Sequence, residues 1–474
     1  MKEFFNIYLI LLIGKFVRYV SSFLRLGSGA TWPGEIALRI DPNILPKLLK
    51  KIKKGIIIVA GTNGKTTTSL LLRNMLLDQG YTVLYNASGA NLQNGIVSTF
   101  FQGTKSAYDF AVFEVDENAL PIILSHLRAR NYKLHIVLLN LFRDQLDRYG
   151  EVDAIAKKWI QSLIALETTA HIYINADDPQ LVFIGKEIEK PVKNRSWNSF
   201  TSGNNRIYYF GLDNKKYYIP KVQHATDSIY CPACGSRLIY KGYYYSHLGD
   251  WSCTVCGLNH PNVHVRSDDV ISPFEGVYNI YNTLAAVSVG KILNVDMLDI
   301  EESFASAAPA FGRLEEVTYK GKKVRILLSK NPTGFNESIR TMLASPNKGP
   351  LLLLLNDRIP DGTDVSWIWD VDFEILDQCN KPIVISGDRY LDMGVRMKYA
   401  LSQIRNPNIE IRNKSKIPNN DQVHKRQKFV VENSLGEAVK QLVDNINENE
   451  TGWVLATYSA MLDVRKILTG KSIL

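Results

Sequence analysis

No run of apolar residues in this sequence is long enough to cross a bilayer as a helix. The longest candidate near the N-terminus, residues 4–13, is followed by Lys15 and Arg18, whereas a spanning helix needs about 20 apolar residues. A secretory signal is not indicated either, because only Lys2 and Glu3 precede the run and no small-x-small cleavage site is clear. The segment predicts either an amphipathic helix lying on a membrane surface or a helix packed on the rest of the chain.

Cysteine is scarce, with five residues in a chain of 474, and four of them form two Cys-x-x-Cys pairs. An odd count with this spacing favours metal binding over disulfides, and with it a reducing compartment. We therefore expect a cytoplasmic protein, located at the inner face of the membrane if its N-terminal segment binds there. The net charge of +9 favours anionic partners such as nucleotides, nucleic acid or lipid head groups, but a solubilising excess of lysine explains it equally well.

Low-complexity tracts and repeats of solenoid period are also lacking, and 45% of the residues are hydrophobic, so the chain is expected to fold into roughly three domains. Predicted strands alternate with predicted helices, which indicates a mainly parallel sheet covered on both faces. The expected strands cover residues 55–60, 81–85, 110–115, 134–139 and 172–175, and the expected helices cover residues 43–53, 66–79, 152–165 and 276–290. A second alternating region has strands at residues 324–329, 351–355 and 383–386, and a polar loop or edge at residues 405–427.

This pattern predicts an α/β fold in three parts. Residues 1–53 form an N-terminal helical segment, residues 54–312 a central ATP-binding domain, and residues 313–474 a C-terminal α/β domain. The composition changes at about residue 200 to a tyrosine-rich, turn-rich region that holds the paired cysteines. A β-rich insertion is therefore expected within the central domain, with a zinc ribbon at about residues 222–264.

The loop from Gly61 to Thr66 lies between a predicted strand and a predicted helix, and it indicates ATP binding. Its members are Gly61, Thr62, Asn63, Gly64, Lys65 and Thr66. The two glycines let backbone N–H groups approach a phosphate, Lys65 can reach the outer phosphates, and Thr66 can offer its hydroxyl to Mg²⁺. The general phosphate-loop pattern is not fully met, because Val59 occupies its first glycine position. The alternative is a simple turn without a ligand, which the flanking strand and helix argue against.

Two carboxylates, Glu114 and Asp116, lie at the carboxyl end of the predicted strand at residues 110–115. Ligands of open α/β sheets bind at the carboxyl ends of the strands, and a carboxylate there can hold Mg²⁺ through oxygen. The alternative is a solvated acidic turn, above all for Asp116.

The paired cysteines have the spacing Cys-x2-Cys-x18-Cys-x2-Cys, which is typical of a zinc ribbon. They are Cys231, Cys234, Cys253 and Cys256. Four thiolates close a tetrahedral site, so the predicted zinc is structural rather than catalytic, with redox cysteines as the alternative. The nearby histidines, His247, His260 and His264, are interpreted as surface residues.

Several segments together resemble the Mur ligase family, whose members join amino acids to peptidoglycan precursors. Residues 61–68 (GTNGKTTT) are similar to the ATP loop of that family. Further similar segments follow in the family's order at residues 140–150, 175–179, 276–282 and 311–315. The resemblance implies that Thr67, Asn279, Asn282 and Arg313 lie near the nucleotide, in addition to the loop itself.

Three features resemble an amidating branch of the family, and they extend the likeness over nearly the whole chain. They are the four-cysteine insertion and the segments at residues 330–334 and 356–370. Tyr278 and Gln145 stand where other Mur ligases have histidine, which fits ammonia rather than an amino acid as the nucleophile. The resemblance implies that ATP phosphorylates the D-glutamate α-carboxylate of lipid II and that ammonia displaces the phosphate, with Lys65, Mg²⁺ on Thr66 and Glu114, and Arg313 supplying positive charge.

Nothing in the sequence indicates a glutaminase, and Cys379 is interpreted as an ordinary cysteine. The resemblance implies a separate, GatD-like glutaminase subunit in a heterodimer, whose Cys–His pair receives its third, acidic member from Asp364 of this chain. Spacing alone does not exclude Asp361 or Asp370. The neighbouring residues Trp367 and Trp369 indicate either a partner surface or core packing.

Two other functions remain open at this stage. One is a Mur-like or folylpolyglutamate-like ligase that adds an amino acid and works without a glutaminase. The other is a nucleic-acid-binding ATPase with a zinc ribbon, but no aromatic-basic RNA motif accompanies the cysteines. We therefore expect no nucleic acid partner, and we expect a lipid-linked substrate with peripheral membrane contact.

Overall fold

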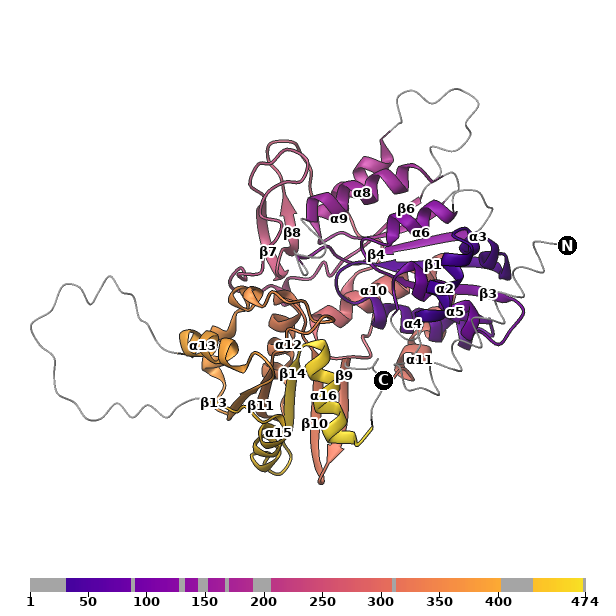
Figure 1. Cartoon of the computed structure of the whole chain (residues 1–474). Coiled ribbons are helices and arrows are strands. Elements are labelled where there is room, and N and C mark those ends of the chain that lie inside the picture. Colours follow the sequence, from indigo (N-terminus) through magenta and orange to yellow (C-terminus); the bar gives the residue numbers. More distant parts are fainter. Residues whose placement is uncertain are drawn as a thin grey trace, which may run out of the picture. The chain divides into compact units, whose positions relative to one another are not determined.

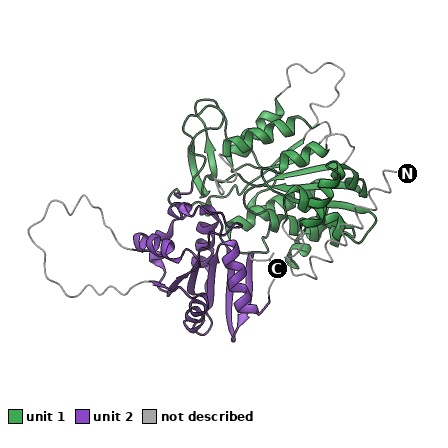
Figure 2. Cartoon of the chain, viewed as in Figure 1, with its two compact units in different colours: residues 1–222, 226–310, 474 green, residues 223–225, 311–473 purple. Residues whose placement is uncertain are grey.

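The structure is a computed structural model, and it describes residues 31–86, 90–127, 133–143, 152–166, 170–190, 206–308, 313–401 and 429–471. The apolar N-terminal run, residues 144–150 of the family segment, residues 311–312 and the polar stretch at 405–427 lie outside the described residues. The chain divides into two compact units, one formed mainly by residues up to Ala310 and the other mainly by residues from Phe311 (Figure 2). Among the described helices, none is both long and apolar enough to cross a membrane.

In the first unit, six described strands form a parallel sheet in the order β2-β3-β1-β4-β5-β6 (Figure 1). The strands are β1 (Ile52–Ala60), β2 (Val83–Tyr85), β3 (Tyr108–Val115), β4 (Lys133–Leu138), β5 (Ala170–Asn175) and β6 (Arg206–Phe210). The central strand β1 is apolar on both faces, because Ile56 and Ile58 join one core cluster whereas Ile57 and Val59 join another. A strand buried on both faces requires helices on both sides of the sheet.

Helices of the first unit cover the two faces of this sheet. On the face of Ile56 lie α2 (Trp32–Ile40), α3 (Ile44–Leu48), η1 (Leu49–Lys51), α5 (Gln93–Gln102), α6 (Leu120–Leu127), α8 (Val152–Ile164) and α9 (Pro179–Glu189). On the face of Ile57 lie α4 (Lys65–Asp78), α10 (Val277–Ile292) and α11 (Met297–Ala305). Between β6 and α10 come η2 (Lys215–Tyr217), the antiparallel hairpin of β7 (Ile239–Tyr245) and β8 (Leu248–Ser252), and η3 (Ser267–Asp269).

The second unit has its own sheet, in the order β13-β12-β11-β14-β10-β9 over the described residues. Its strands are β9 (Arg313–Tyr319), β10 (Lys322–Leu328), β11 (Lys348–Leu354), β12 (Ile383–Ser386), β13 (Phe429–Val431) and β14 (Thr451–Ala456). All neighbours are parallel except β9, which pairs antiparallel with β10. The helices are α12 (Pro332–Ala344), η4 (Ser366–Asp370), η5 (Phe373–Gln378), α13 (Tyr390–Leu401), α15 (Leu435–Asp444) and α16 (Tyr458–Thr469), with α15 and α16 sharing one core cluster.

The alternation of strands and helices predicted from the sequence is confirmed in both units, although strands β9, β13 and β14 of the second sheet were not predicted. Three further features also differ. Residues 43–53 are not one helix, because Ile52 already pairs with Tyr108 in the sheet. Helix α2 was not predicted; it begins beside Pro33, which is tolerated in a first helical turn. Strand β6 belongs to the central sheet, where it pairs with β5, and not to the cysteine-containing insertion.

Candidate functional site

The predicted phosphate loop connects β1 to α4 and has no room for side chains at its two glycines. Gly61 and Gly64 have φ angles of +139° and +90°. A Cβ atom on Gly64 would lie 2.1 Å from Oδ1 of Asn282, and one on Gly61 would lie 3.0 Å from the backbone nitrogen of Asn140. Both glycines are therefore required for conformation and for close approach to neighbouring elements.

The segment after β4 holds this loop through Asn140. The backbone N–H of Asn63 donates to Oδ1 of Asn140 at 2.9 Å, and Nδ2 of Asn140 donates to the carbonyl of Asn63 at 3.1 Å. The N–H of Thr62 donates to the carbonyl of Asn140 at 3.0 Å, and the N–H of Phe142 donates to the Thr62 hydroxyl at 3.0 Å. The side chain of Asn140 thus pairs with the loop as a neighbouring strand would, a role that the sequence did not reveal.

Lys65 begins α4 and is buried beside Glu117, a carboxylate that was not predicted as a site residue. Its Nζ donates to the carbonyls of Gly61 and Thr62, and it lies 3.4 Å from Oε2 of Glu117. The side chains of Lys65 and Glu117 are 7% and 5% exposed, so this ion pair is shielded from solvent. Glu117 stands in the acidic stretch noted in the sequence, but only the turn that follows β3 directs it toward Lys65.

Glu114, predicted as a ligand of Mg²⁺, lies near the carboxyl end of β3, and its role at the metal stays a prediction. It pairs with Val59 in the register of β3 and β1. Phe110 and Val112, four and two positions earlier, pack in the core cluster that contains α4, so the alternation of a strand directs Glu114 to the same side as α4. Thr66 lies in the first turn of α4. The two residues offer oxygen donors, which suit Mg²⁺.

Asp116 is only 4% exposed, which rules out the solvated acidic turn for this residue. Its Oδ1 accepts a hydrogen bond from the N–H of Asn118, and its N–H donates to the carbonyl of Asn91. Asp116 therefore shapes the turn that leads to Glu117.

Helix α10 brings the two predicted asparagines to the start of α4. Nδ2 of Asn282 donates to Oδ1 of Asn279 at 3.1 Å, and the hydroxyl of Thr68 donates to Oδ1 of Asn282 at 3.4 Å. Thr67 is buried in the first turn of α4. Arg313 is the first residue of β9 in the second unit, and its expected role at the phosphates stays a prediction.

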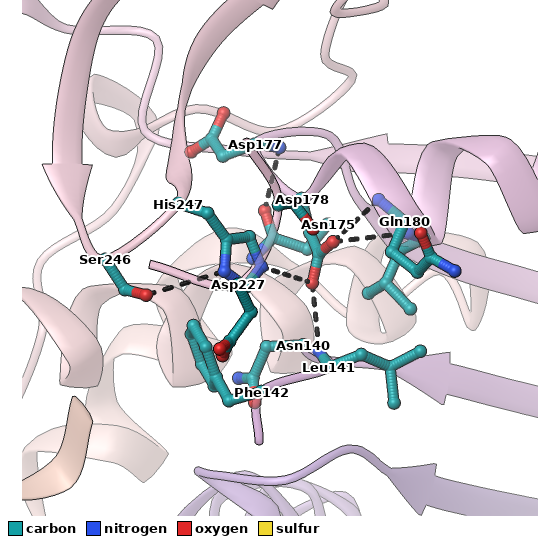
Figure 3. A network of polar contacts seen from close by, with 12 residues as sticks. Asn140, Leu141, Phe142, Asn175, Asp177, Asp178, Gln180, Asp227, Ser246 and His247 are labelled. Atoms are coloured by element: carbon teal, nitrogen blue, oxygen red, sulfur yellow. Dashed lines mark hydrogen bonds and ion pairs between the residues drawn. The ribbon is translucent and has the colours of Figure 1, made fainter. Parts of the chain in front are cut away.

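Two adjacent aspartates, Asp177 and Asp178, link the loop region to the cysteine-containing insertion, and both are fully buried (Figure 3). Oδ1 of Asp178 accepts from the first N–H groups of α9, and its Oδ2 accepts from the N–H of Leu141 at 2.9 Å. Oδ2 of Asp177 accepts from the hydroxyl of Tyr281 at 2.5 Å and from the N–H of Leu212 at 2.9 Å. This network was not predicted, although its two aspartates lie in the segment at residues 175–179 that resembles the Mur ligase family.

The four paired cysteines form one cluster, as their spacing predicts. The four Sγ atoms all lie within 4.8 Å of one another, so the cluster can hold a metal ion. Gly235 and Gly257, with φ angles of +74° and +78°, each donate an N–H back to the first cysteine of the preceding pair. These two turns direct the thiols of both pairs toward a common point.

The interpretation of the nearby histidines as surface residues is wrong for His247 and His260 and confirmed for His264, which is exposed. His247 is fully buried, and its Nε2 lies 3.5 Å from Oδ2 of Asp178. Nε2 of His260 lies 2.6 Å from Oδ1 of Asp177, and His264 accepts the backbone N–H of Tyr209 through Nδ1. Burial would lower the pKa of His260, but the hydrogen bond and the charge of Asp177 outweigh burial and raise it. Sequence alone did not reveal these partners, because they are distant along the chain.

The three candidate acids of the second unit differ in their surroundings. Asp361 is 2% exposed and accepts hydrogen bonds from the N–H and the hydroxyl of Ser459 at the start of α16. Asp364 is exposed and accepts from the N–H and hydroxyl of Ser366, at 2.8 and 3.0 Å, which lower its pKa. Asp370 is half-buried at the end of η4.

Known structures share this fold. A pseudomurein peptide ligase type C from Methanothermus fervidus superposes with a TM-score of 0.62 at 20% identity, over 90% of this chain and 80% of that chain. A MurF ligase from Thermotoga maritima, solved in complex with ADP, superposes with a TM-score of 0.57 at 13% identity, over 91% and 83% of the two chains.

Sequence comparisons define the family. A model of the Mur ligase middle domain matches residues 59–290, and a model described as MurT ligase C-terminal matches residues 328–461. The MurT subunit of a glutamine-hydrolysing lipid II isoglutaminyl synthase from Streptococcus pneumoniae is 32% identical, over 98% of this chain and 97% of its own length. The corresponding subunit from Staphylococcus aureus is 31% identical over 78% of this chain and 83% of its own length. The chain therefore belongs to the MurT branch of the Mur ligase family, and it is an ATP-dependent, amide-forming ligase.

Proposed function

We propose that this ligase amidates the α-carboxylate of D-glutamate in lipid II, using ammonia from a partner glutaminase subunit, as a step in peptidoglycan synthesis. The observation that carries the proposal is the likeness, over nearly the whole chain, to subunits of lipid II isoglutaminyl synthases. The ATP loop supports it, because Asn140 hydrogen-bonds to the loop, and side chains at Gly61 and Gly64 would collide with Asn140 and Asn282. A lipid-linked substrate places the reaction at the cytoplasmic face of the membrane.

The chemistry follows from the poor reactivity of a carboxylate toward ammonia. One carboxylate oxygen attacks the γ-phosphorus of ATP, which forms an acyl phosphate and releases ADP. Ammonia then attacks the acyl carbon, the C–O bond to phosphate breaks, and the nitrogen loses a proton to give the amide. Phosphoryl transfer depends on positioning and charge neutralisation. Lys65 would supply fixed charge at the loop, and Thr66 and Glu114 would hold Mg²⁺, which neutralises phosphate charge when bound.

The reaction can be separated from amino-acid addition by the choice of acceptor. With lipid II present, phosphate release should require ammonium, or glutamine together with the glutaminase subunit, and the product should be amidated lipid II detected by mass spectrometry. Release that depends instead on an amino acid, with a product heavier by that residue, would replace this proposal with a ligase that works alone.

We infer that the cysteine cluster holds a structural zinc ion. Four thiolates are a typical zinc donor set, and all four positions of a tetrahedral site are then filled by protein. Such a site stabilises the fold and leaves no position for a substrate.

Replacing Cys253 with serine is expected to remove stoichiometric zinc and to lower the midpoint of thermal unfolding by about 5 to 10 °C. Cys379→Ser is the matched control, because Cys379 is also buried but lies outside the cluster. Metal analysis of protein purified without chelator is the measurement. A wild-type protein with no stoichiometric zinc would refute the site.

Asp364 is proposed as the acid that this chain supplies to the Cys–His pair of the glutaminase. Its carboxylate is exposed and held in the charged form by Ser366, so it can orient a histidine of another chain. Asp361 is engaged with α16 instead, which leaves Asp370 as the remaining rival.

The surface beside Asp364 has the character of a docking site for this subunit. Leu391, Val395 and Tyr399 recur every four residues on α13 and are 62%, 48% and 55% exposed. Trp369, itself 50% exposed, contacts Tyr399 with ring centroids 5.7 Å apart. Aromatic and aliphatic side chains exposed together favour a protein interface. Trp369 is five residues from Asp364, so docking here would bring the partner to the acid.

Leu391→Glu is expected to weaken association with the glutaminase subunit by about tenfold or more, because a charge would be buried in the interface. Leu298→Glu is the control, since Leu298 is 69% exposed on α11 of the other unit. Titration calorimetry with the purified subunits measures both. If the two variants bound the glutaminase subunit with equal affinity, α13 would not be the docking surface.

A further inference from the structure

Two histidines of the insertion contact the buried aspartate pair without belonging to the cysteine cluster. His247 lies against Asp178 at 3.5 Å (Figure 3). His260 lies against Asp177 at 2.6 Å. The backbone of the insertion is joined to the same turn, because the N–H of Gly249 donates to the carbonyl of Asp177 at 3.0 Å. The insertion is therefore joined to the turn between β5 and α9 by side chains and by main chain.

One connection runs from His247 to one side of the ATP loop. The carboxylate of Asp178 lies between His247 and the N–H of Leu141. Leu141 follows Asn140, whose side chain forms the two hydrogen bonds with Asn63. The ring centroid of His247 also lies 4.8 Å from the ring centroid of Phe142. A displacement of His247 would therefore act on the segment that holds the loop.

A second connection runs from His260 to the other side of the loop. The carboxylate of Asp177 accepts from His260 through Oδ1 and from the hydroxyl of Tyr281 through Oδ2. Tyr281 precedes Asn282 on α10, and Oδ1 of Asn282 lies only 2.1 Å from the position that a Cβ of Gly64 would take. The two connections thus reach the loop from β4 and from α10.

We propose that His247 and His260 are positioning residues of the ATP loop, so that the metal-held insertion sets the geometry in which the nucleotide binds. This rests on the proposed use of ATP by this loop. The physical reason is the burial of two adjacent carboxylates, both 0% exposed, whose charges need donors in place. His260 of the insertion is such a hydrogen-bond partner for Asp177, and the imidazole ring of His247 lies close to the carboxylate of Asp178. Without them the turn would rearrange, and Leu141 and Tyr281 would move with it.

His260→Ala is expected to weaken binding of MgADP by about tenfold, because the deletion leaves a buried carboxylate without one of its donors, while zinc stays stoichiometric. His260→Gln is expected to restore most of the affinity, since its amide can donate to Asp177. His247→Ala should weaken binding in the same direction through Leu141. Calorimetry with MgADP gives the affinities, and metal analysis confirms that the cysteine cluster remains loaded.

The matched control is His264→Ala, which removes a histidine of the same segment that bonds to the backbone of Tyr209 and not to the aspartates. Its affinity for MgADP should equal that of the wild type. Unchanged affinity in His260→Ala, with zinc retained, overturns the inference. Equal losses in His260→Ala and His264→Ala, without rescue by glutamine, also overturn it, since they would reflect general loosening. Failure of the wild type to bind MgADP would instead refute the proposed use of ATP.

Discussion

Asp364→Asn is expected to abolish glutamine hydrolysis by the complex with the glutaminase subunit while leaving ATP binding intact. Asparagine keeps the shape of the side chain but has no charge to stabilise a protonated histidine, and its amide favours the wrong ring tautomer. In hydrolases with a catalytic triad such a change lowers turnover by about 10⁴-fold. The readouts are glutamate release from glutamine and, separately, the affinity of the variant for MgADP.

The ligase half-reaction separates this role from a structural one. With ammonium in place of glutamine, Asp364→Asn should amidate lipid II at the wild-type rate, because ammonia no longer has to be released by the partner. Asp370→Asn is the matched control and should hydrolyse glutamine normally. Full hydrolysis by Asp364→Asn, or its loss in Asp370→Asn instead, would show that another acid completes the triad.

Gly64→Ala is expected to lower ATP-dependent activity by about 100-fold or more, since small misplacements of catalytic groups have effects of this size. Two causes combine: a φ angle of +90° that alanine rarely adopts, and a Cβ only 2.1 Å from Oδ1 of Asn282. The loop and α10 would have to separate to accept the methyl group. MgADP affinity and phosphate release with lipid II and ammonium are the measurements.

Gly80→Ala isolates the first cause from the second. Gly80 has a similar φ of +77°, but a Cβ there would meet nothing within 4 Å. It should therefore lose about 1 kcal/mol of stability and keep its activity. If Gly64→Ala kept its activity as Gly80→Ala does, the close approach of α10 to the loop would not be required for activity.

Much of this site could be predicted from local sequence, because its parts are local. The strand at residues 55–60, the loop at 61–66 and the helix up to Gly80 are consecutive, and each has its own pattern. Spacing alone likewise predicted the cysteine cluster, because each Cys-x-x-Cys pair forms its own turn.

The rest depends on contacts between distant residues, which no local pattern contains. Asn140 is 77 positions from Asn63, and His260 is 83 from Asp177. Histidines that contact buried carboxylates have the same local surroundings in sequence as histidines at a surface. The ion pair of Glu117 with Lys65 also depends on the turn after β3, whose direction the sequence does not reveal.

The hydrogen bonds between the acidic loop and α16 have a consequence for the order in which activity is acquired during synthesis. Asp361 and Asn356 bond to Ser459, and the N–H of Asn356 donates to the hydroxyl of Thr457. The loop that presents Asp364 is thus held by Thr457 and Ser459 at the start of α16, a helix made near the end of translation. A chain released before β14 lacks these anchors and would not align Asp364. In the role proposed for Asp364, an unfinished ligase would not complete the triad of its partner, and glutamine hydrolysis would wait for a complete chain.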